Sequence, residues 1–171
     1  SAALGSALTV MTGCSQAPVD SNIAAEASAQ TIYLVRHAEK LTGDDPALTP
    51  QGHERAQALR DWLLDKNIEA IYSSDFVRTQ QTAAPLANAL GLTVRAYDPS
   101  KLEALVMEIT DFGQTALVVG HSNTTPPLAE IFGAPSFGPI IEATEYDRLY
   151  EIVRVDDSTA ADLHRYGAPS Q

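Results

Sequence analysis

The chain has 171 residues, of which 44% are hydrophobic and 19% charged, so it can bury the core of one domain and does not have the composition of a disordered chain. Its 22 acidic and 11 basic residues give a net charge of −11, which argues against general nucleic-acid binding and against electrostatic docking on anionic lipid. The single cysteine excludes an internal disulfide framework and a multi-thiolate zinc site.

The first thirty residues differ in composition from the rest. Residues 1–12 carry no charge and are rich in small and apolar types, and they lead to the lone Cys14. This pattern is typical of an export leader, and small residues directly before a cysteine are typical of a bacterial lipoprotein signal. The sequence departs from the leader pattern in that no Lys or Arg precedes the apolar run, and the alternative is a buried N-terminal helix. We expect a truncated leader over 1–14, a flexible tether over 15–30, and an extracytoplasmic protein of the periplasm or cell envelope with a lipid anchor at Cys14.

The remainder alternates strand-like and helix-like patterns. In chain order these patterns predict a strand at 31–36, a helix at 49–66, a strand at 70–73, a helix at 76–90, a strand at 93–97, a helix at 100–112, a strand at 115–120, a helix at 125–132, a loop at 133–144, a strand at 146–155 and an edge segment at 161–166. Repeated strand–helix units imply a three-layer α/β/α fold with a mostly parallel central sheet. The run at 115–120 is the most apolar, so we expect it at the centre of the sheet.

Polar residues that can carry chemistry follow three of the predicted strands. Arg36 and His37 end the first strand, and Arg78 lies one turn into the helix after the second. His121 and Ser122 follow the most apolar strand. Taken singly, each has an ordinary structural explanation: a surface ion pair, an exposed helix residue or a hydrogen-bonded core histidine. Together, at one edge of a sheet in an acidic chain, they suit a phosphate dianion, because guanidinium groups match phosphate oxygens.

At these residues the sequence resembles the histidine phosphatase superfamily, the phosphoglycerate mutase-like proteins. The matching stretches are LVRHAEK at 34–40, DPALTPQGHERAQAL at 45–59, IYSSDFVRTQQTA at 71–83 and LVVGHSN at 117–123. The family's hallmark is Arg-His-Gly, and Ala38 stands here in the third place, which leaves the two reacting side chains unchanged. The resemblance implies a phosphoglycerate mutase-like fold for residues 31–171.

The resemblance also implies a role for each matching residue. His37 would attack phosphorus and become a phosphohistidine, while Arg36, Arg78 and His121 would bind the phosphoryl oxygens with Ser122 beside them. A neutral imidazole is a good nucleophile, and we expect its second ring nitrogen to donate to a backbone carbonyl. Cationic side chains already supply the charge that stabilises a transferring phosphoryl group, so we expect no cofactor and no metal. The competing interpretation is a metal site built from the two histidines and nearby carboxylates.

The general acid that protonates an alkyl leaving group is the open assignment. In the resembled family it commonly lies between the second arginine and the second histidine, where this chain offers Asp98 and Glu103. Glu39, close to the nucleophile, is a third candidate. Glu103 also fits a capping box that begins at Ser100, and Asp98 fits a turn. A phosphohistidine or acyl phosphate would need little help from an acid.

The expected function is a metal-independent phosphatase acting on a phosphomonoester or phosphohistidine, in a small phosphorylated molecule or a phosphoprotein. Mutases of the resembled family carry an insertion over the site, and here a helix, a strand and a second helix fill residues 79–120, so we expect an open, water-accessible site. The alternatives are a non-catalytic protein that binds phosphoryl ligands and, third, a phosphomutase. Residues 41–47, 98–103 and 133–144 are expected to form the pocket walls, and they indicate neither a substrate nor an oligomeric state.

Overall fold

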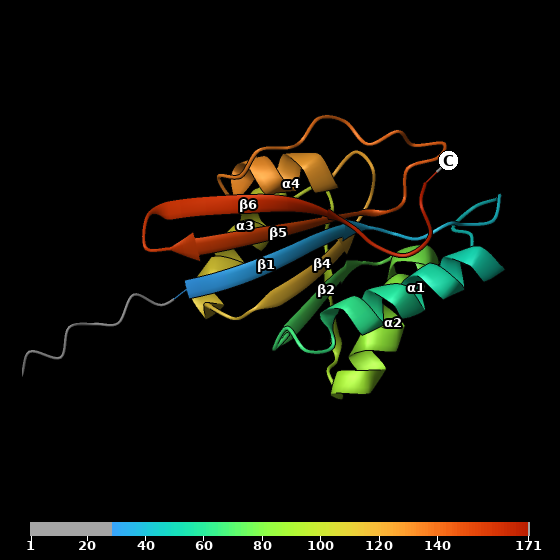
Figure 1. Cartoon of the computed structure of the whole chain (residues 1–171), viewed down its shortest axis with the longest axis horizontal. Coiled ribbons are helices and arrows are strands. Elements are labelled where there is room, and N and C mark those ends of the chain that lie inside the picture. Colours follow the sequence, from blue (N-terminus) through green and yellow to red (C-terminus); the bar gives the residue numbers. More distant parts are fainter. Residues whose placement is uncertain (1–28, 171) are drawn as a thin grey trace, which may run out of the picture.

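The computed structural model describes residues 29–170 of the chain. These residues form one six-stranded sheet with helices on both faces (Figure 1). The elements, in chain order, are β1 (Ala29–Arg36), α1 (Pro50–Leu63), β2 (Ala70–Ser74), α2 (Val77–Leu90), β3 (Val94–Tyr97), α3 (Leu102–Phe112), β4 (Ala116–Gly120), α4 (Thr125–Ile131), β5 (Arg148–Val155) and β6 (Ser158–Arg165).

The sheet has the strand order β3-β2-β4-β1-β5-β6. The first four of these strands are parallel, β5 pairs antiparallel with β1, and β6 pairs antiparallel with β5 at the edge of the sheet. The expectation of a mostly parallel sheet with the 115–120 strand near its centre is therefore confirmed. Because Arg36 pairs in register with Gly120, the carboxyl ends of β1 and β4 lie level at one edge. That edge is the end of the sheet near the C-terminus in Figure 1.

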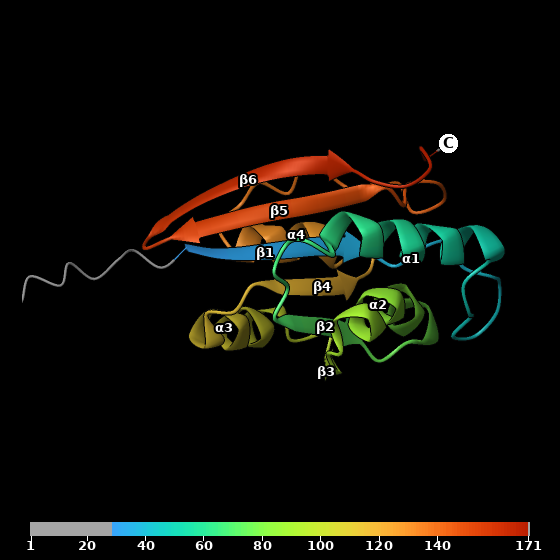
Figure 2. The same cartoon turned by 60° about the horizontal axis from the view of Figure 1, so that its bottom comes forward.

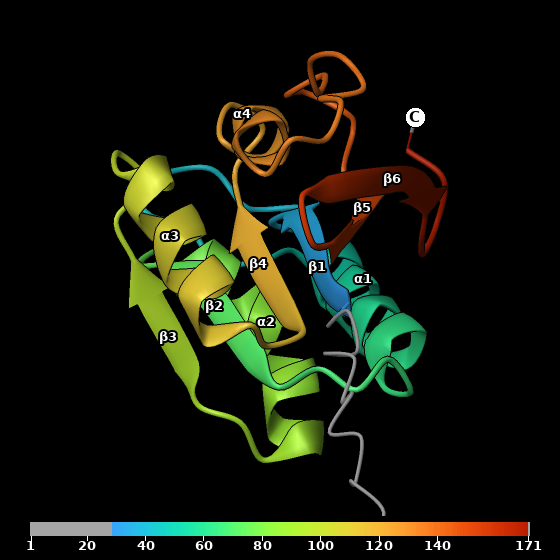
Figure 3. The ribbon, with the colours of Figure 1, turned by 90° about the vertical axis from the view of Figure 1, so that its left-hand side faces the viewer.

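Alternate residues of each central strand face opposite layers of helices. On β1, Ile32 and Leu34 pack in the core that includes α3 and α4, whereas Tyr33 and Val35 pack in the core that includes α1 and α2. In Figure 2, α1 and α2 lie in front of the strands and α4 lies behind them, and Figure 3 shows α3 and α4 on the side of the sheet opposite α1 and α2. This is the expected three-layer arrangement, produced by strands that are apolar on both sides.

The ends of the helices show where local chemistry was predicted correctly and where it was not. The Thr49 side chain caps α1 by accepting a hydrogen bond from the N–H of Gly52 at 3.0 Å, as the sequence predicts. The capping box at Ser100 is wrong, because α3 begins at Leu102 without a side-chain cap. Instead, the Ser100 hydroxyl donates to Asp98 Oδ1 at 2.7 Å, and this turn competes with the cap for the same side chain.

The first strand begins at Ala29, so the last two residues of the expected tether belong to the sheet. The buried Gln30 amide donates to the carbonyl oxygens of Ile109 at 2.7 Å and Gln114 at 3.0 Å. The expected leader, Cys14 and the rest of the tether lie outside the described residues. Between residues 29 and 170, no helix combines the length and the apolar character that crossing a bilayer requires.

Candidate active site

The structure brings together the two histidines and two arginines that the sequence predicts. The backbone N–H of His37 donates to the carbonyl of Gly120 at 2.9 Å, which joins the segment after β1 to the end of β4. The rings of His37 and His121 then lie edge to face, with centroids 5.6 Å apart. The positive charges of Arg36 and Arg78 act on both rings and disfavour their protonation. The four side chains therefore form one electropositive site at the carboxyl edge of the sheet.

His37 is fixed in the tautomer that a nucleophile needs. Its Nδ1 lies 2.8 Å from the carbonyl oxygen of Ala38, and because a carbonyl only accepts, the ring hydrogen is on Nδ1 and Nε2 carries the lone pair. Burial lowers the pKa of His37 to about 3; the bond to Ala38 opposes this shift, and the charge of Arg36 adds to it. The expected bond to a backbone carbonyl is confirmed, and the ring is neutral at physiological pH.

His121 belongs to a chain of hydroxyl groups that fixes its hydrogen as well. The Thr79 hydroxyl donates its hydrogen to the backbone carbonyl oxygen of Ser74 at 2.8 Å. The same hydroxyl oxygen therefore acts as the acceptor in its second bond, from the side-chain hydroxyl of Ser74 at 3.1 Å. Ser74 Oγ must then accept from His121 Nε2, 2.8 Å away. Burial, followed by the charge of Arg78, lowers the pKa of His121 to about 4. Nδ1 of the neutral ring therefore carries the lone pair and becomes a donor only when the ring is protonated.

Arg36 binds the segment before β5 and also keeps one donor available in the site, two functions that the sequence did not separate. Its Nη1 donates to the carbonyl of Glu145 at 2.9 Å and its Nη2 to that of Glu142 at 2.8 Å, while the guanidinium stacks on Tyr146 at 4.1 Å from the ring centre. These contacts attach the segment before β5 to the site. The buried Nε–H of Arg36 has no hydrogen-bond partner within residues 29–170.

Arg78 also keeps a donor available. Its Nη1 lies 3.5 Å from the carboxylate of Asp45, within the expected 41–47 wall, and its guanidinium stacks on Phe76 at 4.5 Å. Its Nε–H is buried and, like that of Arg36, unpartnered in the part of the chain that the structure describes. Leaving a buried donor unsatisfied costs about 1–3 kcal/mol. A phosphoryl oxygen between the two arginines would satisfy these donors.

The site is more enclosed than we expected from the sequence. Arg36 is 1% exposed and His37 only 2%, although residues 79–120 hold no more than the rest of α2, β3, α3 and β4, as predicted. The cover comes instead from the 133–144 loop and the residues that follow it, which are bound by Arg36. The nucleophile is thus enclosed from this side, whereas a hollow adjoins Arg78 and His121, so water access to the site stays a prediction.

None of the three predicted acids has the surroundings of a proton donor. Glu39 binds Arg55 through two parallel hydrogen bonds, at 2.9 and 2.7 Å, and is an ion-pair partner. Asp98 is an ion-pair partner as well: its Oδ2 lies 3.7 Å from Nζ of Lys101, and its Oδ1 accepts from the backbone N–H and the hydroxyl of Ser100, so its pKa is lowered. Glu103 lies exposed in the first turn of α3.

Sequence reasoning missed Glu142, a carboxylate beside the site. The hydroxyl of Ser122, which we expected to contact substrate, donates to Glu142 Oε2 at 2.8 Å. The charge of Glu142 also acts on His121 and on Arg36. The only signal in the sequence was the 133–144 loop as a pocket wall, and loop residues have no periodicity that would single out one side chain.

Two hollows border the site. One of about 330 Å³ is lined by Phe76, Arg78, Pro99, Ser100, His121, Asn123 and Thr124. The other, of about 220 Å³, is lined by Glu39, Gln51, Ala143, Thr144, Tyr146, Pro169 and Ser170. Within residues 29–170, no three His, Cys, Asp or Glu side chains cluster in a way that could bind a metal ion.

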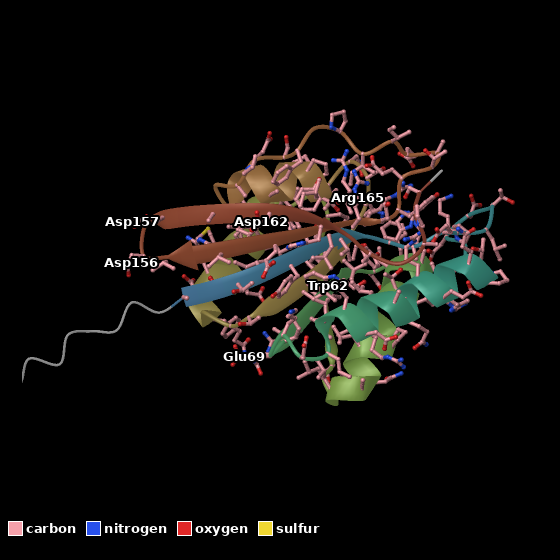
Figure 4. The ribbon with its side chains drawn as sticks, in the orientation of Figure 1. Trp62, Glu69, Asp156, Asp157, Asp162 and Arg165 are labelled. Carbon is pink, nitrogen blue, oxygen red and sulfur yellow. The ribbon has the colours of Figure 1, made fainter. Side chains whose placement is uncertain are left out.

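Part of the acidic surplus lies far from the site. Figure 4 shows Asp156 and Asp157 at the turn between β5 and β6, and Arg165 toward the opposite end of β6. Glu69 directly precedes β2 and so also lies at the amino edge of the parallel strands. Because exposed charges more than about 10 Å apart are largely screened at 0.1 M salt, these acids do not cancel the local positive charge.

Comparison with known sequences supports the resemblance to the histidine phosphatase superfamily. Residues 32–99 match the sequence model of the histidine phosphatase superfamily, branch 1. Over 71 residues the chain is 39% identical to GpmB of Yersinia pestis, described as a probable phosphoglycerate mutase; this covers 37% of the chain and 33% of GpmB. A stretch of 48 residues, 28% of the chain, is 52% identical to PE_PGRS11 of Mycobacterium tuberculosis and spans 8% of that protein. The chain thus matches at most about a third of these relatives' length.

Solved structures match over most of the described chain. Mycobacterial glucosyl-3-phosphoglycerate phosphatase Rv2419c has a TM-score of 0.64 at 15% identity, covering 82% of this chain and 100% of the other. The protein histidine phosphatase SixA in complex with tungstate has a TM-score of 0.60 at 19% identity, covering 80% and 95%. Alpha-ribazole phosphatase of Shigella flexneri has a TM-score of 0.61 at 16% identity, covering 81% and 96%. The fold is the phosphoglycerate mutase-like fold, and within it residues 32–99 match branch 1 of the histidine phosphatase superfamily.

Proposed function

We propose that the protein is a metal-independent phosphatase that hydrolyses a phosphomonoester or a phosphohistidine through a phosphorylated His37. The observation that carries the proposal is the bond of Nδ1 to the Ala38 carbonyl, which leaves a lone pair on Nε2 of a ring whose pKa is lowered to about 3. A nucleophile in this state needs no base to activate it.

The reaction has two displacement steps. In the first, Nε2 of His37 forms a bond to phosphorus while the bond from phosphorus to the leaving group breaks, and the leaving group takes the electron pair and a proton. In the second, water attacks phosphorus, the bond to Nε2 breaks, and inorganic phosphate leaves with the neutral imidazole restored. The Nε–H groups of Arg36 and Arg78 can donate to the equatorial oxygens in both steps.

The charge of the site supports the binding of a dianion. Burial and the two guanidinium charges keep His37 and His121 neutral. A bound phosphoryl dianion offsets those guanidinium charges and raises the pKa of both rings. Protonation of His121 then supplies an Nδ1–H donor, while its Nε2–H stays bonded to Ser74.

The hollow of about 330 Å³ beside Arg78 and His121 leaves room for a substrate that extends beyond its phosphoryl group. We propose a small phosphorylated molecule or a phosphoprotein segment as that substrate. The solved relatives support either class, since Rv2419c is named a glucosyl-3-phosphoglycerate phosphatase and SixA a protein histidine phosphatase. Tungstate and inorganic phosphate were bound in structures of SixA and Rv2419c.

We also propose that the protein works outside the cytoplasm, attached through lipid at Cys14. This rests on the uncharged apolar residues 1–12 and the small residues before the cysteine. Metabolic labelling with a radioactive fatty acid should mark the natural protein, and Cys14→Ser should abolish the label. An unlabelled natural protein that fractionates with the cytosol would contradict this proposal.

A phosphomutase is the second candidate, favoured by the burial of His37 and by the similarity to GpmB. A covered phosphohistidine would be protected from water and could return its phosphoryl group to a second position of the substrate. With a phosphoglycerate as substrate, isomerisation faster than phosphate release would support the mutase. Phosphate release faster than isomerisation would support the phosphatase.

The decisive experiment is hydrolysis of p-nitrophenyl phosphate by the full chain in excess EDTA. His37→Ala should abolish turnover, and His53→Ala, at an exposed position of α1, should retain it as the matched control. A rapid alkaline quench should trap a phosphoprotein in the wild type and not in His37→Ala. Full activity in His37→Ala would overturn the mechanism. Vanadate binding without turnover of any phosphoester or phosphoramidate would support the non-catalytic alternative.

A further inference from the structure

The carboxylates near the site differ in whether an arginine neutralises them. Glu39, Asp45 and Glu145 each pair with an arginine. Glu142 makes no ion pair with any residue between 29 and 170, and its Oε2 accepts the hydroxyl hydrogen of Ser122 at 2.8 Å. Its side chain is exposed and can exchange protons with solvent. Glu142 is therefore a carboxylate beside the site that no cation of the described residues neutralises and that solvent can reach.

Two residues of the site determine where Glu142 lies. Its backbone carbonyl accepts from Nη2 of Arg36 at 2.8 Å, so the guanidinium that borders the nucleophile also positions this part of the loop. Its carboxylate is bound by Ser122, the residue directly after His121. The negative charge of Glu142 favours the protonated forms of both His121 and Arg36, which places it within electrostatic reach of the phosphoryl site.

We propose that Glu142 is the general acid for phosphoester substrates and that Ser122 is a positioning residue for its carboxyl group. This assignment rests on the proposed phosphatase function. In the first step the carboxylic acid of Glu142 gives its proton to the leaving oxygen as the bond from phosphorus to that oxygen breaks, and Glu142 becomes a carboxylate. In the second step the carboxylate takes a proton from the attacking water as the bond from phosphorus to Nε2 of His37 breaks, which restores the acid.

A proton donor matters only when the leaving group is poor, and this gives a test that a merely structural role would fail. An alkoxide needs a proton to leave, whereas 2,4-dinitrophenolate leaves without one. Loss of the acid should therefore slow the first step, which kcat/KM reports, far more with glycerol phosphate than with 2,4-dinitrophenyl phosphate. General acid catalysis typically contributes about 10²–10⁴-fold, which sets the size of the expected difference.

The experiment measures kcat/KM of the full chain on both substrates for the wild type and Glu142→Gln, with Glu103→Gln as the matched control on α3. Glu142→Gln should lose about 10²-fold or more on glycerol phosphate and little on 2,4-dinitrophenyl phosphate. Glu142→Asp should recover part of the lost rate. Glu103→Gln should match the wild type on both substrates, because its side chain is exposed and lines neither of the two hollows that border the site.

Ser122→Ala tests the positioning role separately. It should lower kcat/KM on glycerol phosphate by less than Glu142→Gln does, and have little effect on kcat/KM for 2,4-dinitrophenyl phosphate. Equal losses on both substrates in Glu142→Gln, no loss on either, or a gain on both would overturn the assignment while leaving the phosphatase intact. A wild type that binds vanadate and hydrolyses neither substrate would overturn both proposals.

Discussion

The guanidinium of Arg55 binds the carboxylate of Glu39 through two parallel hydrogen bonds, with Nε to Oε2 at 2.9 Å and Nη2 to Oε1 at 2.7 Å. Arg55 is 2% exposed, and its other donors bind the carbonyl oxygens of Tyr166 at 2.8 Å and Ala168 at 2.9 Å. One buried arginine of α1 therefore joins the segment after His37 to the chain beyond β6, and so helps to fix the position of the nucleophile.

The first prediction concerns this ion pair. Arg55→Met should lower the free energy of unfolding by about 3–5 kcal/mol, because it leaves the carboxylate of Glu39 without its partner in a poorly hydrated place. Glu39→Leu should lower the free energy of unfolding by a similar amount. In the double variant this free energy should fall by clearly less than the sum of the two single losses. Urea unfolding of the four proteins measures this coupling. Strictly additive losses would show that the pair contributes no interaction of its own.

The second prediction concerns Gly52, whose position in the first turn of α1 lies against the backbone of Glu39. A Cβ at Gly52 would overlap the Glu39 carbonyl oxygen. Alanine favours a helix by up to about 1 kcal/mol over glycine, but overpacking against backbone costs about 1–3 kcal/mol. Gly52→Ala should therefore lower the free energy of unfolding, and should lower kcat because Glu39 lies two residues from His37. Gln57→Ala, on the exposed face of α1, should change neither, and a Gly52→Ala protein as stable as this control would contradict the argument.

The sequence allows the prediction of the sheet and the four site residues for a simple reason. Strand patterns are local, and the carboxyl ends of parallel strands must meet at one edge, so Arg36, His37 and His121 could be brought together without any knowledge of distant contacts. The bond from Nδ1 of His37 to a backbone carbonyl was expected instead from the nucleophile role that the family resemblance implies, and the acceptor is the neighbouring residue Ala38.

The cover over the site could not be predicted in this way. It depends on bonds from Arg36 to backbone carbonyls of Glu142 and Glu145, more than 100 residues away in the chain. A backbone carbonyl is present in every residue, so the side chains of the 133–144 loop do not indicate that an arginine binds the backbone there. The capping box at Ser100 failed for a related reason, because Asp98 offers the serine hydroxyl a nearer acceptor.

The third prediction separates the two arginines of the site. Arg36→Ala should lose phosphate binding and also about 2–3 kcal/mol of stability, because it leaves the carbonyls of Glu142 and Glu145 without their charged donor. Arg78→Ala should lose phosphate binding at a stability cost of no more than about 1 kcal/mol, since its ion pair with Asp45 is long and partly exposed. Vanadate binding and urea unfolding of both variants provide the comparison.

Arg36→Lys serves as the control, because it keeps the charge and loses the planar group that binds two carbonyls at once. It should resemble Arg36→Ala in stability more than it resembles the wild type. Equal stability of Arg36→Ala and Arg78→Ala would mean that the segment before β5 is held by other contacts.

The fourth prediction is a loss of stability in mild acid. Burial lowers the pKa of His37 to about 3 and that of His121 to about 4, whereas both groups titrate near 6.5 in the unfolded chain. Between these values the unfolded state binds more protons than the folded state, so stability is complete above about pH 6.5 and falls as the pH is lowered toward 4. In that range each histidine lowers the free energy of unfolding by up to about 1.4 kcal/mol for each unit by which the pH falls.

Urea unfolding in phosphate-free buffers at pH 7, 6 and 5 measures this slope. Carboxylates whose pKa is lowered in the folded protein, such as Glu145 and Asp147, add their own acid sensitivity below about pH 4.5, so the window above pH 5 reports mainly on the histidines. His121→Asn should remove one of the two contributions and make the curve flatter. A free energy of unfolding that stays constant between pH 7 and pH 5 would mean that the two rings are solvated, and the nucleophile would then lack the neutral, enclosed state on which its reactivity depends.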